Sequence, residues 1–160
     1  MEIGIIAVGR LKNGPERDLF SRYYERSKKS AKQLGLSGFS LKELPESQRK
    51  NTQERKSEEA KAIRKALPTG AITIVLDEHG KSISSTEFAS KISSWADEGN
   101  SLLQFIIGGA DGLEKDLIKE ASLVIGFSKM TWPHQLVRIM LAEQIYRTTT
   151  ILNSHPYHRS

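Results

Sequence analysis

The alternation of short apolar runs with amphipathic helical stretches most constrains the fold of this 160-residue chain. Runs rich in β-branched and aromatic residues predict buried strands at residues 2–8, 39–44, 71–76, 102–107 and 123–127. Apolar residues at helical spacing predict helices at residues 15–32, 48–67, 85–98, 113–120 and 134–150. Strands that alternate with helices form βαβ units, so the order predicts an α/β fold: a mainly parallel sheet flanked by helices on both faces.

Length and composition set broader limits. The length predicts a single domain over residues 1–160, and the apolar fraction of 38% suits a soluble globular protein. The absence of cysteine excludes disulfides and thiolate metal sites, and it is consistent with a cytoplasmic location. The first apolar run is too short for a signal peptide or a membrane span, so no membrane association is predicted. The net charge of +5 is compatible with an anionic partner such as nucleic acid, without identifying one.

The segment at residues 45–59 is strongly polar. We expect it to begin as a mobile loop before the helix starts. The chain shows no internal repeat and no low-complexity region.

Three predicted strands are followed by segments that could form a ligand site, because ligands bind beyond the carboxyl ends of parallel strands. The first is the strand end at residues 75–80. The second contains Gly108-Gly109-x-x-Gly112, where glycine lets the backbone approach a ligand closely. Its spacing is neither the dinucleotide fingerprint nor a Walker A loop, so on its own a tight strand-to-helix turn is the favoured interpretation.

The third segment, residues 127–134, mixes apolar and small polar residues between a strand and a helix. Its backbone groups and apolar walls suit a flat heteroaromatic ring. Pro133 places His134 in the first turn of the last helix, where in isolation it is expected only to cap the helix.

The tail at residues 153–159 gathers proton donors, a phenol ring and a cation, and it leaves three interpretations open. His155 and His158 are three residues apart and could bind a metal, but no carboxylate is near and Arg159 would repel a cation, so no metal is predicted. Tyr157 could stack on a base while Arg159 meets phosphate in an RNA contact. The third interpretation is a disordered chain end.

Taken together, these segments resemble the bacterial ribosomal RNA large-subunit methyltransferase H family over essentially the whole chain. The matching segments are residues 5–9, 75–77, 105–113, 131–147 and 153–159. The resemblance implies a small SPOUT-class enzyme that uses S-adenosylmethionine to methylate N3 of a pseudouridine in 23S rRNA of the assembled ribosome. It also implies a SPOUT-type α/β knot, in which the last strand, loop and helix form a C-terminal trefoil knot.

The resemblance further implies the site residues. The expected cofactor contacts are Leu76, Gly108, Phe127, Ser128, Lys129, Met130, Thr131 and Trp132. We hypothesise in addition that Arg159 and His158 face the base, with Tyr157 stacking on it or orienting it, and that His134 and Arg138 are second candidates. A homodimer is implied, in which the tail of one subunit completes the site of the other, and the wide apolar face of the last helix is consistent with such a partner.

Two other functions stay open at this point. The chain could be a non-catalytic ribosome-binding or RNA-binding module, which would not bind S-adenosylmethionine. It could also be a nucleotide-binding α/β protein of another activity, which only the glycines support.

Overall fold

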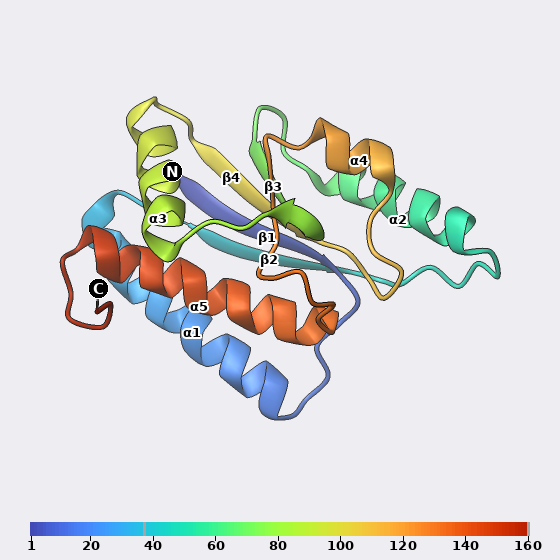
Figure 1. Ribbon diagram of the computed structural model, residues 1–160, viewed down its shortest axis with the longest axis horizontal. Helices are drawn as coiled ribbons and strands as arrows, with labels where there is room; N and C mark the ends of the chain where they lie inside the picture. The colour runs from blue at the N-terminus through green and yellow to red at the C-terminus, as the bar shows by residue number, and fades with distance from the viewer. Residues whose placement is uncertain (37, 160) are drawn as a thin grey trace.

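The computed structural model describes residues 1–36 and 38–159 (Figure 1). The elements in chain order are β1 (Glu2–Val8), α1 (Pro15–Ala31), the short 3-10 helix η1 (Lys32–Leu34), β2 (Phe39–Leu44), α2 (Thr52–Ala66), β3 (Ile72–Lys81), α3 (Ser85–Asp97), β4 (Leu102–Ile107), α4 (Lys115–Glu120), β5 (Leu123–Ile125) and α5 (His134–Leu152). The five strands form one sheet in the order β2-β1-β4-β3-β5, and every pairing is parallel. The predicted α/β class with a parallel sheet is therefore confirmed.

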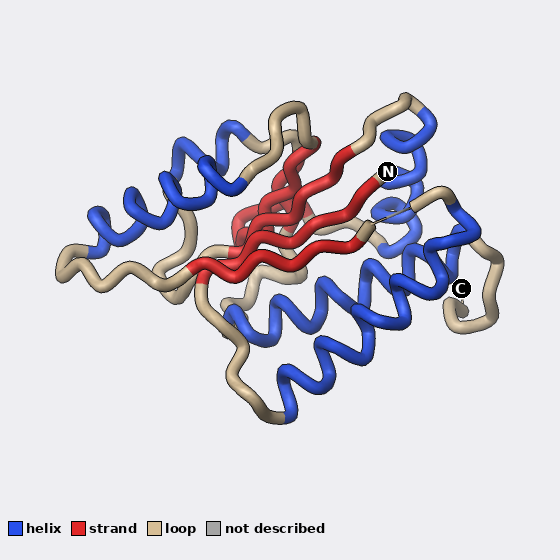
Figure 2. The backbone as a smooth tube through the Cα atoms, turned by 180° about the vertical axis from the view of Figure 1, so that it is seen from behind, coloured by secondary structure: helices blue, strands red, loops and turns tan. Residues whose placement is uncertain are grey.

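The sheet lies between two layers of helices, with α1, α3 and α5 on one face and α2 and α4 on the other (Figures 1 and 2). Side chains alternate between the faces along each strand. Ile3 and Ile5 of β1 face the α1, α3 and α5 side, whereas Ile6 and Val8 pack with residues of α2. Burial on both faces explains why the central strands have almost continuous apolar sequences.

Helix α5 packs against both α1 and α3. Its buried residues include Leu141, Ala142, Ile145 and Thr149, which cover more than one side of the helix. Two helical neighbours and the sheet thus account for the wide apolar face of α5 without a second copy of the chain. None of the helices in the described residues is long and apolar enough to cross a membrane.

The start of α2 differs from the prediction, since the helix begins at Thr52 rather than at residue 48. Asn51 explains the boundary, because its side chain accepts a hydrogen bond of 2.8 Å from the backbone N–H of Gln53 and thereby caps the helix. Residues 45–51 form a loop, as expected, but their contacts with α2 show that this loop is fastened to the helix.

The loop after β5 lies close to the carboxyl end of β3. Strand β5 ends at Ile125, earlier than predicted, and the N–H of Gly126 donates to the carbonyl of Lys81 at 3.1 Å. A Cβ on Gly126 would lie 2.8 Å from the carbonyl oxygen of Asp77, and a Cβ on Gly80 would lie 2.5 Å from the carbonyl carbon of Ile125. The two glycines permit this close approach, which places the loop at residues 126–133 beside the ends of β3 and β4.

Candidate active site

A cleft with a volume of about 450 Å³ opens at the carboxyl edge of the sheet. Residues 76–79 of β3 and the segments that follow β4 and β5 meet there, so the three segments singled out from the sequence line one cavity. The volume falls within the range of small-molecule sites. Of the expected cofactor contacts, the following line the cleft: Leu76, Gly108, Phe127, Ser128, Met130, Thr131 and Trp132. Lys129 is exposed and does not line it.

The glycine-rich segment after β4 is a tight turn that also forms a wall of the cleft. The N–H of Gly112 donates to the carbonyl of Gly109 at 3.0 Å, and Gly112 has a φ of 78°. A Cβ on Gly108 would lie 2.9 Å from Cγ of Leu113 and 3.0 Å from the carbonyl carbon of Gly112. The two interpretations of this motif are therefore compatible, since the turn requires glycine and faces the cavity.

The loop after β5 is held in shape by its own side chains. The hydroxyl of Ser128 accepts hydrogen bonds from the Met130 N–H at 3.0 Å and from the Trp132 indole N–H at 2.9 Å. Thr131 donates its hydroxyl proton to Glu78 on the opposite wall of the cleft. Met130 and Trp132 nevertheless remain 69% and 40% exposed, so the mouth of the cleft carries an apolar surface.

His134 lies in the wall of the cleft with 17% of its side chain exposed, and its Nε2 is 3.8 Å from Oε1 of Glu46. Burial lowers the pKa of His134, Glu46 opposes this shift, and the charge of Arg138 adds to it. The ring is therefore neutral at physiological pH and can accept a proton or a hydrogen bond. This position beside the cavity goes beyond the capping role expected for an isolated histidine.

Arg138 does not reach the cleft, which corrects its selection as a second candidate for contact with the base. Its side chain is fully buried, and it donates to Oε1 of Glu43 at 2.6 Å. It also donates to the carbonyl oxygens of Val8 and Gly9, at 3.2 Å each. Arg138 therefore ties α5 to the ends of β1 and β2 and stabilises the framework behind the site.

The tail folds back onto α5 instead of fraying. The hydroxyl of Tyr157 donates to Oε1 of Glu143 at 3.1 Å, and its ring centroid lies 4.8 Å from that of Tyr146. The guanidinium of Arg147 covers the Tyr157 ring at 4.9 Å, and one of its nitrogens lies 3.4 Å from Nδ1 of His158. These contacts hold Tyr157 and His158 against α5, which favours an ordered tail over the disordered interpretation.

Within one chain, the structure does not bring the tail to the cleft. Among the described residues, none from 154 to 159 lines the cavity. Glu143, which anchors Tyr157, comes nine residues after His134 in α5, a rise of about 14 Å along the helix axis. Tyr157, His158 and Arg159 are thus separated from His134 in the same protomer.

The two tail histidines face different partners. Nδ1 of His155 accepts the backbone N–H of Tyr157 at 3.2 Å, whereas Nδ1 of His158 lies beside Arg147. No group of histidines and carboxylates in residues 1–36 and 38–159 is arranged to hold a metal ion. The structure gives the metal interpretation of the tail no support.

Comparisons with known proteins identify the family of this chain. A family described as predicted SPOUT methyltransferase matches residues 1–158. The chain belongs to this family. It is also 54% identical to the ribosomal RNA large subunit methyltransferase H of Allorhizobium ampelinum, and 49% identical to the protein of the same name from Bradyrhizobium diazoefficiens. Both alignments cover 100% of each chain, and they confirm the resemblance stated from the motifs.

A solved structure supports the fold of this SPOUT methyltransferase. A probable methylase family protein from Haemophilus influenzae superposes with a TM-score of 0.52 at 11% sequence identity, over 99% of this chain and 70% of that protein. Together with the family match, this likeness confirms the SPOUT-type α/β fold, while the trefoil knot remains a prediction from the resemblance.

Several residues of the cleft were not predicted from the sequence. Lys56 of α2 lines the cavity, and Glu46 faces His134. Both belong to the polar segment at residues 45–59, where dense charge is typical of a solvated surface and gives no signal of a site. Asp77 and Glu78 also line the cleft, and here the strand end at residues 75–80 was the signal.

Proposed function

We propose that the chain transfers the methyl group of S-adenosylmethionine to N3 of a pseudouridine in 23S rRNA of the assembled ribosome, in the cytoplasm. The observation that carries the proposal is the cleft at the carboxyl edge of the sheet, in a member of the SPOUT methyltransferase family. The names of the relatives that are about half identical to this chain point to ribosomal RNA as the substrate.

The walls of the cleft fit the parts of S-adenosylmethionine. Leu76 offers an apolar surface to the adenine or ribose, and the backbone groups of residues 127–132 can bond the adenine edge. Gly108 lines the cleft, and because it has no Cβ the turn can pack closely on Leu113 and present its backbone to the ribose and methionine portion. Lys56 provides a cation for the methionine carboxylate, and Asp77 and Glu78 provide anions for the positive groups. The cofactor, when bound, supplies an electrophilic methyl group on its sulfonium.

Transfer to N3 imposes three demands on the protein. The nitrogen must lie in line with the methyl group, the imide proton must leave, and the charge that develops on the imide must be stabilised. Positioning contributes up to roughly 7–11 kcal/mol in ideal cases. Donors aimed at the imide oxygens, which we assign to Arg159 and His158, add electrostatic stabilisation. We assign the role of proton acceptor to His134, which lines the cleft and whose neutral form is favoured by burial.

The position of the tail favours a homodimer in which each tail serves the cleft of the other subunit. Glu143 and Arg147 fix Tyr157 away from the cleft of its own chain. Met130 and Trp132 expose apolar side chains at the mouth of that cleft, Leu136 exposes another in the first turn of α5, and a second copy can cover them. Tyr157 then acts as an anchor that orients His158 and Arg159, rather than as a ring stacked on the base.

Calorimetric titration with S-adenosylmethionine tests the cofactor assignment. We expect saturable binding, and we expect Gly108→Val to abolish it because the added side chain would collide with Leu113 and Gly112 and displace the turn that lines the cleft. ATP serves as the comparison ligand, since binding of ATP in place of S-adenosylmethionine would indicate another nucleotide-dependent activity. If the wild-type chain bound neither ligand but still bound ribosomes, it would be a non-catalytic RNA-binding module, and the proposal would fail.

A further inference from the structure

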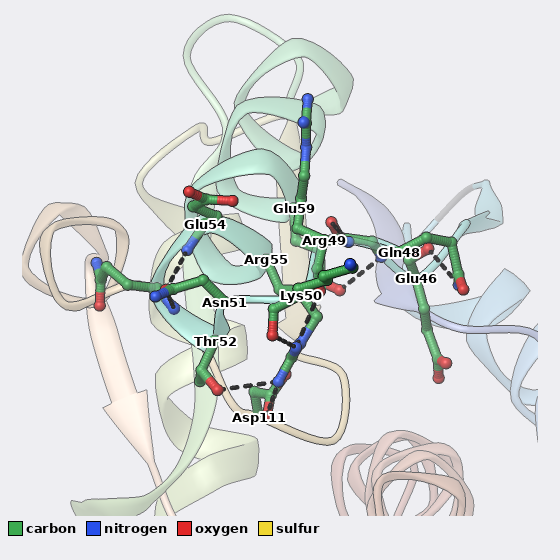
Figure 3. A network of polar contacts seen from close by, with 12 residues as sticks. Glu46, Gln48, Arg49, Lys50, Asn51, Thr52, Glu54, Arg55, Glu59 and Asp111 are labelled. Carbon is green, nitrogen blue, oxygen red and sulfur yellow. Dashed lines mark hydrogen bonds and ion pairs between the residues drawn. The ribbon is translucent and has the colours of Figure 1, made fainter.

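A polar network joins the start of α2 to the turn after β4 (Figure 3). Nε of Arg55 donates to Oδ2 of Asp111 at 2.6 Å, and a terminal nitrogen of Arg55 donates to Oδ1 at 3.2 Å. Asp111 lies in the Gly109–Gly112 turn, which lines the cleft. The two-pronged geometry fixes the orientation of the carboxylate as well as its position.

The remaining donors of Arg55 bind the segment just before α2. One nitrogen donates to the carbonyl oxygens of Arg49 and Lys50, at 2.9 Å each, and the other donates to the hydroxyl of Thr52 at 2.9 Å. A guanidinium has five N–H donors, and with the two bonds to Asp111 all five are used. Arg55 therefore holds the turn and the segment at residues 49–52 in one fixed arrangement.

Glu59 lies one helical turn after Arg55 in α2 and contacts the same segment after β4. It is 7% exposed, and its Oε1 accepts the N–H of Ser47 at 2.9 Å. A Cβ on Gly109 would lie 3.5 Å from Oε2 of Glu59, so the backbone of the turn packs closely against this carboxylate. Helix α2 thus contacts the turn at two points, Gly109 and Asp111.

We propose that Arg55 and Asp111 are positioning residues for the methyl donor, a role that rests on the proposed binding of S-adenosylmethionine in the cleft. Residues 108–112, which contain the turn, include three glycines in five positions, so without the ion pair this segment would populate many conformations. Ordering these conformations on binding would cost free energy. The ion pair orders the turn in advance, and the Arg55 guanidinium holds the pKa of Asp111 below its usual value, which keeps the pair charged.

A second arginine of α2 provides a matched control. Arg64 donates to Glu114 at 2.9 Å and to Glu120 at 2.8 Å, and so it joins the same helix to the start and end of α4. None of these three residues lines the cleft. Arg64→Ala removes a comparable link between α2 and the chain after β4 but leaves the turn untouched.

The test is a calorimetric titration of S-adenosylmethionine into the full-length wild type, Arg55→Ala, Asp111→Asn and Arg64→Ala. We expect the Kd to rise about 10-fold for Arg55→Ala and for Asp111→Asn, and to stay unchanged for Arg64→Ala. The double variant should bind no more weakly than either single variant, because each change breaks the same pair. Arg55→Lys should not restore affinity, because an ammonium cannot make the two-pronged contact.

The paired substitutions separate positioning from a direct charge effect. Arg55→Ala removes a positive charge near a cationic ligand and Asp111→Asn removes a negative one, so a direct effect would shift the Kd in opposite directions. A positioning role raises the Kd of both variants. Wild-type affinity in both folded variants, opposite shifts, or an equal loss in Arg64→Ala would overturn the inference. Asp111→Asn preserves the shape of the side chain, so this variant is expected to fold. If the wild type did not bind S-adenosylmethionine, that result would overturn the proposed function instead.

Discussion

The hydroxyl of Tyr157 donates to Oε1 of Glu143, and the same oxygen accepts two hydrogen bonds from Arg147. One carboxylate thus fastens the tail to α5 through a residue whose ring also packs on Tyr146. Burial, followed by the neighbouring Tyr23 and Glu143, raises the pKa of Tyr157, so its phenol stays protonated and remains a donor across the physiological range.

Tyr157→Phe tests this anchor. The change removes one hydrogen bond and keeps the ring packing, so we expect the tail to lose about 1 kcal/mol of anchoring, and methylation of ribosomes to fall roughly five-fold. Cofactor affinity should not change, because Tyr157 does not line the cleft of its own chain. Equal rates for Tyr157→Phe and the wild type would show that the hydroxyl does not orient the tail.

Mixing two defective subunits tests whether the tail acts on the second copy. One subunit ends at Asn153 and lacks the tail, and the other carries Gly108→Val and lacks a functional cleft. Each should be inactive alone, and the mixture should regain methylation because the heterodimer pairs an intact cleft with an intact tail. Arg159→Ala in the subunit with the blocked cleft should prevent this rescue. A mixture as inactive as its parents, with both parents folded and dimerised, would contradict a tail that acts between subunits.

Arg138 should matter for stability rather than for contact with substrate. Arg138→Met removes the buried partner of Glu43 and the donors to two backbone carbonyls. We expect the free energy of unfolding in urea to fall by about 3–5 kcal/mol, as for other broken buried ion pairs. Lys12→Met, an exposed cation in the loop after β1, is the control and should leave it nearly unchanged. A loss of activity without loss of stability in Arg138→Met would contradict this role.

The lowered pKa of His134 predicts a pH dependence of stability. The folded protein binds the proton of this ring more weakly than the unfolded chain, whose histidine titrates near 6.5. Stability contributed by the neutral ring is therefore complete above that value and is lost as the pH falls towards the lower folded pKa. Urea denaturation between pH 7.5 and about 5 should show this loss in the wild type, and His134→Gln should reduce it. An identical pH profile in the variant would indicate that the His134 pKa is not lowered.

The regular part of the fold could be predicted because it depends on local patterns. The apolar sequences of β1 and β4 reflect burial on both faces, and the helices between strands follow from apolar spacing. Boundaries were less predictable, as the later start of α2 shows, because it depends on a single capping contact by Asn51. A trefoil knot has no local signature, so it is predicted from the resemblance alone.

The site could be predicted in part. The strand-end rule located the turn at Gly108 and the loop at residues 127–132, because a parallel sheet gathers these segments at one edge. Polar pairs between distant residues were not predictable: Arg55 and Asp111 are 56 positions apart, and Glu43 and Arg138 are 95 apart. The position of the tail depends on Glu143 and Arg147, which in the sequence read only as polar positions of a helix.

The central claim is methyl transfer to N3 of a pseudouridine in 23S rRNA. The most direct measurement incubates the protein and S-adenosylmethionine carrying a labelled methyl group with ribosomes from a strain that lacks the modification, and then maps the label by mass spectrometry of nuclease fragments. We predict one labelled pseudouridine, methylated at N3, in the 23S rRNA of wild-type reactions and none with Gly108→Val. Label on another base or another RNA, or no transfer by a chain that binds the cofactor, would contradict the account.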